Sequence, residues 1–236
     1  MAHFLLIHGT WHGSWCWDRL SPILKERGHE VWSPTLVGLA ERAGEASPQT
    51  GLATHVDQIT KLIQDTGLDD FSLVGHSYGG LVMVGVAERI PQNIAHLVYL
   101  DALVPDHGQS AFDLMPGAEA GFVAAMRSAG SEYLVPPMSP QDLGVTEMSD
   151  VKWMAPLMTP MPILTHREKV VAPLHKAFNI PSTYIHCLQF GLGAGFARQA
   201  RRNGWQVLDV DDGHDVMITN PKLLADLLEK AVQGST

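Results

Sequence analysis

Apolar and polar residues alternate in blocks along most of the chain, and these blocks predict strands and helices in turn. The continuous apolar run Phe4–Ile7 is typical of a strand buried on both faces of a parallel sheet, and the mostly apolar stretch Phe71–Val74 predicts another strand. Further strands are expected at 30–35, 94–100, 182–188 and 205–210. Apolar residues at three- and four-residue spacing predict helices around 56–63, 81–90, 196–202 and 221–232. This alternation is typical of a parallel sheet with right-handed crossovers.

The first helix has its own start and stop signals. Ser21 followed by Pro22 is a favourable pair for opening a helix, and Gly28 is expected to close it. Small and polar residues between Val37 and Gly51 predict a loop before the next helix.

The regular alternation stops between residues 104 and 180, a stretch rich in methionine and proline. We expect residues 1–103 and 181–236 to form an α/β core, and residues 104–180 to form a cap insertion over the carboxyl edge of its sheet. Ligands bind at that edge in open α/β sheets. Methionine-rich walls suit a pocket for an apolar ligand, and we predict Trp11 and Met158 as substrate-binding residues. A lobe that serves only packing is the alternative.

Composition and charge narrow the classes of function. The chain has 236 residues, 45% hydrophobic and 17% charged, which fits one folded α/β domain with an insertion. Its 16 basic and 25 acidic residues give a net charge of −9 without a lysine- or arginine-rich run. This balance argues against binding to nucleic acid or to an anionic membrane and leaves a small molecule as the expected partner.

The cysteines and the N-terminus indicate a compartment. Cys16 and Cys187 are far apart in sequence and lack metal-type spacing, so we expect both to be reduced thiols. The first residues enter a strand directly, without the basic start and long apolar stretch of a signal peptide. Together these features favour the cytoplasm.

One stretch combines a strand, a sharp turn and a helix. The apolar run 71–74 leads into Gly75-His76-Ser77-Tyr78-Gly79, and an apolar helical pattern follows at once. At such a turn the glycines remove side chains that would collide, and the serine hydroxyl stands exposed above the sheet. Ser77 is therefore predicted to be a nucleophile, and a helix-capping serine is the alternative.

A serine hydroxyl needs a base to take its proton, and histidine is the usual base. His214 follows the last strand and precedes the last helix, which places it at the same sheet edge as Ser77. His8 and His76 flank the nucleophile loops and are expected to make structural hydrogen bonds. The four-residue spacing of His8 and His12 does not favour a metal site, because no carboxylate accompanies them in that glycine-rich loop.

Ester cleavage places negative charge on the carbonyl oxygen, so two hydrogen-bond donors must already point at it. We expect one to be the backbone N–H of Tyr78, directly after the nucleophile and at the start of its helix. The other is expected to be the N–H of Thr10, where Gly9 allows a close approach.

Four segments together resemble the α/β-hydrolase superfamily, and within it the small branch that holds plant methyl esterases, hydroxynitrile lyases and bacterial carboxylesterases. They are His8–Trp15, Gly75–Gly80, Tyr99–Pro105 and Gly213–His214. The resemblance runs nearly end to end. It implies an α/β-hydrolase fold, with a mostly parallel sheet flanked by helices and a cap insertion. It also implies a serine hydrolase without a cofactor, with Ser77, His214 and both N–H groups in the roles given above.

The acid that orients the histidine departs from the family pattern. In the family it normally follows the strand predicted at 182–188, where this sequence has Phe190, which cannot orient an imidazole. Asp101, at the carboxyl end of the preceding strand, is the predicted substitute, because some hydrolases and lipases of this fold carry their acid there. The alternative for Asp101 is a structural aspartate that binds backbone amides at the cap entrance. The predicted catalytic set is Ser77, His214 and Asp101.

The leading hypothesis is hydrolysis of a small apolar or aromatic carboxylic ester through an acyl-Ser77 intermediate. Lyase or cyclase chemistry on the same scaffold is the alternative. Cyanide chemistry is disfavoured, because the hydroxynitrile lyases of this branch have threonine where Gly9 stands and lysine where Asp215 stands. A receptor-like ligand-binding protein is a third hypothesis, against which the intact Ser77 and His214 argue. A homodimer is left open.

Overall fold

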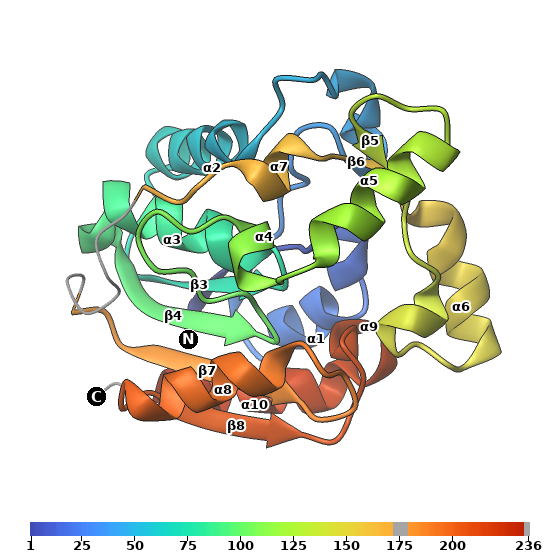
Figure 1. Cartoon of the computed structure of the whole chain (residues 1–236). Helices are drawn as coiled ribbons and strands as arrows, with labels where there is room; N and C mark the ends of the chain where they lie inside the picture. Colours follow the sequence, from blue (N-terminus) through green and yellow to red (C-terminus); the bar gives the residue numbers. More distant parts are fainter. Residues whose placement is uncertain (172–178, 234–236) are drawn as a thin grey trace.

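The computed structural model describes residues 1–171 and 179–233, and its centre is a sheet of six strands (Figure 1). The strands are β1 (His3–Ile7), β2 (Glu30–Trp32), β3 (Phe71–His76), β4 (Ile94–Leu100), β7 (Ser182–Cys187) and β8 (Gln206–Val210). Their order is β2-β1-β3-β4-β7-β8, and every neighbouring pair is parallel. The predicted parallel sheet is therefore confirmed.

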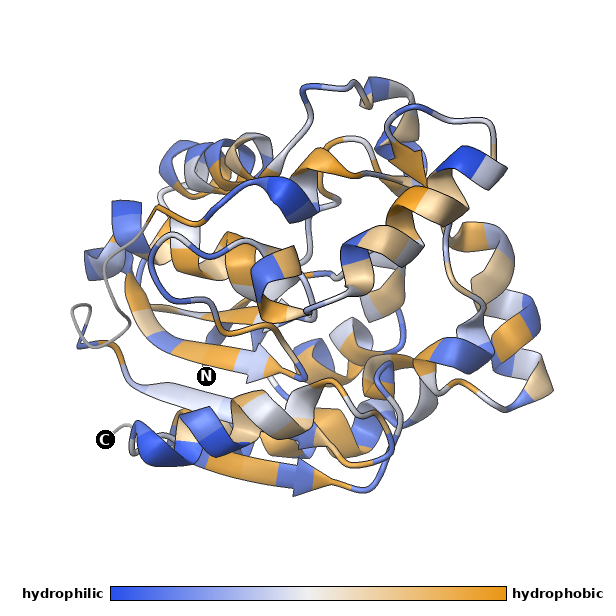
Figure 2. Ribbon diagram, viewed as in Figure 1, coloured by the Kyte–Doolittle hydropathy of each residue, from blue (hydrophilic) through white to orange (hydrophobic). Residues whose placement is uncertain are grey.

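Helices cover both faces of this sheet. They are α1 (Leu20–Glu26), α2 (Leu52–Thr66), α3 (Gly79–Arg89), α8 (Gly193–Arg202), α9 (Val216–Thr219) and α10 (Pro221–Gln233). α2 packs on α3, α1 packs on α10, and α8 lies against β7 and β8 (Figure 1). Phe4 and Leu5 point to opposite faces of β1 and are both fully buried, as the apolar strand pattern predicts. Figure 2 shows the same hydrophobic character along β4.

No helix within residues 1–171 and 179–233 combines the length and the apolar character needed to cross a membrane.

The first helix begins differently from its sequence signals. It starts at Leu20 with Arg19 as the N-cap, so Ser21 lies inside the helix and caps nothing. Leu20 and Leu24, one helical turn apart, are both fully buried. Packing of this apolar face, rather than the capping preference of serine, therefore sets the start of the helix. Gly28 does follow the helix end, with a left-handed φ of 85°.

The predictions for the second strand and the following loop also differ in detail from the structure. β2 ends at Trp32 instead of reaching residue 35, and the predicted loop 37–51 contains a short 3₁₀ helix at Ala40–Glu45. β2 is an edge strand of the sheet, where a strand has a partner on one side only.

Between β4 and β7 the chain forms short elements, which we call the cap. They are α4 (Ala111–Leu114), α5 (Ala118–Ser128), β5 (Leu134–Val135), α6 (Met148–Met154), β6 (Met161–Pro162) and α7 (Leu164–Arg167). β5 and β6 pair antiparallel as a separate small sheet. Residues 172–178 of the predicted insertion 104–180 lie outside the described residues.

The strand order creates the place for a site. β1 lies between β2 and β3, so successive strands are added on opposite sides of β1. Crevices form outside the carboxyl ends of parallel strands at such a point. The loops after β1, β3, β4 and β8 carry Thr10, Ser77, Asp101 and His214, so the fold brings these four predicted residues to one edge.

Candidate active site

The turn between β3 and α3 places Ser77 at its apex. Ser77 has a left-handed φ of 55°, a conformation that residues with a Cβ rarely adopt. The strand and helix approach so closely that a Cβ on Gly75 would lie 2.7 Å from the carbonyl oxygen of Gly79, and a Cβ on Gly79 would lie 2.6 Å from that of Ile7. The two glycines of the motif therefore allow the tight turn that the sequence predicts.

His214 is joined to the carboxylate of Asp101. Its Nδ1 lies 2.7 Å from Asp101 Oδ2, and both side chains are buried. A carboxylate oxygen accepts, so the imidazole donates its Nδ1–H. In the neutral ring this leaves Nε2 unprotonated, with a lone pair that can accept a proton.

Asp101 is held in place by its surroundings at the end of β4. Its own N–H donates to the carbonyl oxygen of Ile185 (2.8 Å), and its Oδ1 accepts the N–H of Cys187 (3.3 Å). On the other side, a Cβ on Gly193 would overlap Asp101 Oδ1. The neighbouring strand β7 and the glycine at the start of α8 thus form the niche for this carboxylate.

The ring of His214 is enclosed on two further sides. Phe190 stacks on it with 4.3 Å between ring centroids, and the ring of His76 lies at 4.4 Å. His76 Nε2–H donates to the carbonyl oxygen of His214 at 3.1 Å. Burial, and to a smaller extent the nearby His214, hold the pKa of His76 well below its usual value, so His76 is a neutral donor. Phe190, at the family's acid position, packs against the imidazole instead of accepting from it.

The loop after β1 approaches Ser77 from the other side. A Cβ on Gly9 would lie 2.8 Å from Ser77 Cβ, so only glycine allows this approach. Within the described residues, neither the Thr10 N–H nor the Tyr78 N–H donates to a protein acceptor. His8 supports the loop through hydrogen bonds of its ring with Gly9 O (2.9 Å) and Leu36 N–H (3.0 Å). This is the structural role predicted for His8.

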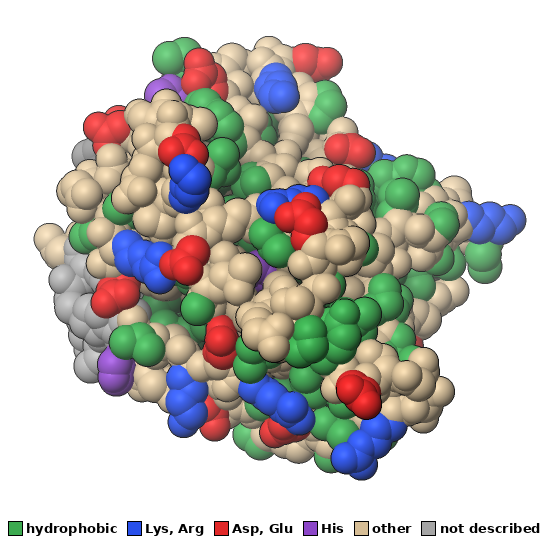
Figure 3. Space-filling view, turned by 90° about the horizontal axis from the view of Figure 1, so that it is seen from above, with side chains coloured by type: hydrophobic (Ala, Val, Ile, Leu, Met, Phe, Trp, Pro, Cys, Tyr) green, Lys and Arg blue, Asp and Glu red, His purple; other side chains and the backbone are tan. Residues whose placement is uncertain are grey.

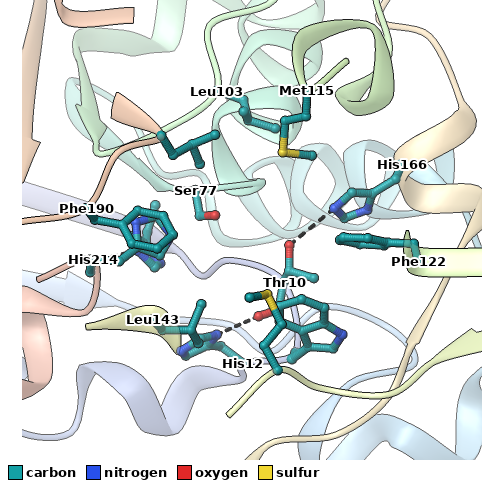
Figure 4. Close-up of a pocket in the computed structure, with 14 residues that line it drawn as sticks. Thr10, His12, Ser77, Leu103, Met115, Phe122, Leu143, His166, Phe190 and His214 are labelled. Carbon is teal, nitrogen blue, oxygen red and sulfur yellow. Dashed lines mark hydrogen bonds between the residues drawn. The ribbon is translucent and has the colours of Figure 1, made fainter. Parts of the chain in front are cut away.

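These loops and the cap enclose a cavity of about 130 Å³ beside Ser77 and His214 (Figure 4). Its apolar lining is Trp11, Leu103, Met115, Phe122, Met138, Leu143, Phe190 and Leu192, and its polar lining is Thr10, His12, His76, Ser77, His166 and His214. Seen from above, a histidine is visible near the middle of this face, among hydrophobic, charged and other side chains (Figure 3). Apolar side chains thus meet a few polar groups at one place, as in small-molecule sites.

The structure brings Trp11 to this cavity but not Met158. Met158 is buried and is not among the described residues that line the cavity. The N–H of the neighbouring Thr159 donates to Trp11 O at 3.1 Å, so this segment packs behind the Trp11 loop. Met115 and Met138 contribute the methionine wall instead.

Sequence reasoning missed two polar features of the site. His166, on α7, reaches the cavity and contacts the Thr10 hydroxyl (Figure 4). His12 lies 3.3 Å from the carboxylate of Asp215, and both are buried. Neither pair has a spacing signal, because the partners are more than 150 residues apart in sequence.

Burial and the mutual attraction of His12 and Asp215 act in opposite directions on the pKa values of this pair. Burial would raise the pKa of Asp215, but the charge and hydrogen bond of His12 outweigh it and lower the pKa to about 2. Burial would likewise lower the pKa of His12, and Asp215 raises it above its usual value. Within the described residues, no group of three ligating side chains is arranged to hold a metal ion.

Comparison with known proteins shows which family has this architecture. The model of the alpha/beta hydrolase family matches residues 4–227. The carbendazim hydrolyzing esterase of Nocardioides sp. (strain SG-4G) is 35% identical over 241 residues, which cover 97% of this chain and 98% of that protein. Methylesterase 1 of Arabidopsis thaliana is 38% identical over 109 residues, 44% of this chain and 40% of that protein.

A solved structure superimposes on this chain over nearly its whole length. The extracellular alpha/beta-hydrolase from a Paenibacillus species superimposes with a TM-score of 0.86 and 25% identity, covering 98% of this chain and 99% of that one. Together with the family match, this likeness supports an esterase-type hydrolase. The chain belongs to the alpha/beta hydrolase family.

Proposed function

We propose that this protein is a serine-dependent carboxylic ester hydrolase that acts through an acyl-Ser77 intermediate. The observation that carries the proposal is the 2.7 Å hydrogen bond from His214 to buried Asp101, in the wall of the cavity that Ser77 also lines. A histidine held through Nδ1–H by a buried carboxylate presents Nε2 as a base for a serine hydroxyl. Esterase relatives, one of them aligned nearly end to end, support this reading.

In the proposed reaction, His214 Nε2 takes the Ser77 proton while Oγ attacks the ester carbonyl carbon. The carbonyl oxygen becomes negative and accepts hydrogen bonds from the N–H groups of Thr10 and Tyr78. The intermediate collapses as His214 returns the proton to the leaving alkoxy oxygen, which departs as an alcohol. Water, activated by the same imidazole, then attacks the acyl carbon, releasing the acid and restoring Ser77.

The size and lining of the cavity favour a small apolar or aromatic ester. Its volume of about 130 Å³ is similar to that of an apolar cavity of about 150 Å³ known to hold one benzene ring. Most of its wall is aromatic or aliphatic, including Trp11, Phe122 and Leu143. An ester with one ring or a short branched chain fits this space.

The proposal extends to the cellular setting. Both cysteines are free and buried, as suits a protein of a reducing compartment, and we propose the cytoplasm. We propose a small-molecule ester as the partner and neither nucleic acid nor an anionic membrane, because the net charge is −9.

Labelling by a fluorophosphonate tests the nucleophile, alongside a screen of aryl, alkyl and methyl esters. We expect one equivalent of label on Ser77, none on Ser77→Ala, and hydrolysis of at least one ester class by the wild type only. Equal labelling of both proteins would refute the acyl-serine mechanism. Saturable binding of an ester without any turnover would instead favour the receptor-like alternative.

A further inference from the structure

The hydroxyl group of Thr10 lies in the active-site cavity, next to the N–H group that we propose as an oxyanion donor. Both Thr10 and His166 line the cavity, and the Thr10 Oγ1 lies 3.3 Å from His166 Nε2. In Figure 4 this hydroxyl lies between His166 and Ser77. Its hydrogen-bonding state therefore matters to whatever binds beside the nucleophile.

A chain of hydrogen bonds behind the cavity fixes the direction of each proton. Thr165 Oγ1 lies 2.6 Å from the carbonyl oxygen of Pro162, which can only accept, so Thr165 donates its single proton there. Thr165 Oγ1 must then accept from His166 Nδ1, 3.0 Å away. His166 therefore carries its proton on Nδ1.

The other nitrogen of His166 is consequently an acceptor. Burial lowers the pKa of His166 to about 3, so the ring is neutral at ordinary pH and Nε2 has a lone pair. Thr10 Oγ1 then donates its proton to Nε2. A hydroxyl has one proton only, so Thr10 can offer the cavity an acceptor but no donor.

The surroundings keep this arrangement rigid. Tyr78 stacks on the His166 ring at 5.2 Å with an interplanar angle of 11°, and Phe122 packs on it at 5.3 Å. The Tyr78 hydroxyl is itself bonded to His55 Nδ1 at 2.9 Å. His166 is fully enclosed, with 1% of its surface exposed, so its ring cannot turn to exchange donor and acceptor without disturbing this packing.

We propose that the site selects 2-hydroxy esters, which carry an O–H donor on the carbon bonded to the carbonyl carbon, and that Thr10 Oγ1 accepts this hydrogen bond. The inference rests on the proposed ester hydrolysis. In threonine, the backbone nitrogen and Oγ1 are three bonds apart. In a 2-hydroxy ester, the carbonyl oxygen and the hydroxyl oxygen are also three bonds apart. One residue can thus hold both groups of the substrate.

The substrate class is therefore the ester of a 2-hydroxy acid. Methylating its hydroxyl oxygen removes the donor and leaves an acceptor facing another acceptor, the Thr10 oxygen. Sites built around a hydrogen bond reject analogues that leave a buried group unpaired. Selectivity for the donor form should therefore be large compared with a simple size effect.

The experiment compares kcat/KM for a matched pair, methyl 2-hydroxy-2-phenylacetate and its 2-methoxy analogue. We expect the wild type to prefer the hydroxy ester by about tenfold or more. Thr10→Val, of similar shape but without an acceptor, should bring this ratio close to the value that the size difference alone would give, whereas Thr10→Ser should retain it.

His166→Phe gives an opposite test within the same site. Without the Nε2 acceptor, the Thr10 proton is free to face the cavity, so the methoxy ester should gain relative to the hydroxy ester. Each ratio compares two substrates on one protein sample, so loss of folded enzyme in a variant cancels. A wild-type ratio near one, or a ratio unchanged in Thr10→Val, overturns the proposal.

A binding measurement separates this inference from the proposed function. Calorimetric titration of Ser77→Ala with the same pair reports the preference without turnover, and we expect about tenfold tighter binding of the hydroxy ester. Preference in binding without Ser77-dependent hydrolysis would reject the proposed function and keep the inference. Hydrolysis of methyl phenylacetate with no preference within the pair would reject the inference and keep the proposed function.

Discussion

Asp101 and Phe190 contact the same imidazole from neighbouring strands. Asp101 directly follows β4, beside β7, and reaches His214 at 2.7 Å. Phe190, in the loop after β7, stacks on the same ring at 4.3 Å. In the proposed mechanism Asp101 orients the ring, while Phe190 packs against it.

Replacing Asp101 by Asn should lower kcat by about 10³- to 10⁴-fold with little change in KM. An amide can donate to Nδ1 and so favours the ring tautomer with its proton on Nε2, which cannot accept from Ser77. The measurement is steady-state kinetics on an ester found in the screen. Asp211→Asn is the matched control, because Asp211 is exposed in the same loop as His214, and its activity should stay at the wild-type level. Full activity of Asp101→Asn would exclude Asp101 from the proposed set.

The buried pair of His12 and Asp215 predicts a pH-dependent stability. Asp215 has a pKa lowered to about 2 from its usual 3.8, so its contribution is complete above about pH 4 and is lost as the pH falls toward 2. His12 has a raised pKa, so its contribution is complete below about pH 6.5 and is lost as the pH rises through that raised value. The pair therefore stabilises the fold most between these limits.

Urea unfolding of Asp215→Asn at several pH values tests this window. We expect a loss of about 3 kcal/mol in the free energy of unfolding near pH 5, and a smaller loss near pH 2.5 and pH 9. Asp65→Asn removes an exposed pair with Lys61 and serves as the control, with a change of at most about 0.5 kcal/mol. A loss that is the same at every pH would mean that packing, not charge, holds this pair.

Among the elements, α8 shows how the start of a helix can make room for a buried carboxylate. Gly193 begins the helix, and its missing side chain leaves the space that Asp101 Oδ1 occupies. Glycine at position 193 is thus tied to the proposed position of the acid, because a larger residue there would need the space of the carboxylate.

Gly193→Ala should reduce kcat by about 100-fold and lower the free energy of unfolding by about 1–3 kcal/mol. The added methyl group overlaps Asp101 Oδ1 and crowds His186, so it displaces the carboxylate and with it the imidazole. Gly195→Ala is the control two residues further on, where the added carbon meets nothing nearer than Arg198 Nη2 at 4.0 Å. Its activity should not change. Equal activity of Gly193→Ala and Gly195→Ala would show that the Asp101 carboxylate can move aside without loss of function.

The sheet and its helices could be predicted from the sequence because local apolar patterns specify them. The runs at β1 and β3 and the spacing in α2 and α10 are such patterns, and the elbow at Ser77 follows from its glycines. The start of α1 could not be predicted in this way, because burial of Leu20 overrides the capping preference of Ser21.

The cap wall depends on packing between distant segments. Met115 reaches the cavity while Met158 packs elsewhere, and both lie in the same methionine-rich stretch. The partners of His12 and His166 could not be predicted from the sequence for the same reason, because each pair joins segments that are distant in sequence. Tertiary packing, rather than local pattern, decides each of these positions.

For the whole molecule, one arginine links the cap to the core. Arg19, at the start of α1, donates to Asp150 (2.9 Å) on α6 and to the carbonyl oxygen of Ile218 (2.8 Å) on α9. Its guanidinium also lies 4.6 Å from the ring centroid of Trp153. Three parts of the chain far apart in sequence thus meet at this side chain.

Arg19→Ala should lower the melting temperature by about 3–6 °C, because the variant loses a half-buried ion pair and a cation–π contact worth about 1–2 kcal/mol together. Differential scanning calorimetry measures the shift. Arg127→Ala, an exposed arginine of α5, is the control and should shift it by less than about 1 °C. Identical melting of both variants would mean that α6 is held by its apolar contacts alone.

The left-handed backbone at Trp11 (φ 66°), Ser77 (φ 55°) and Asp101 (φ 42°) has a consequence for engineering. Each such conformation is unfavourable for a residue with a Cβ, by about 1 kcal/mol or more. Glycine at position 77 would relieve one of them and remove the proposed nucleophile in the same step. A library sorted only for heat resistance would therefore drift toward inactive survivors, so every round of selection on this scaffold must also score turnover.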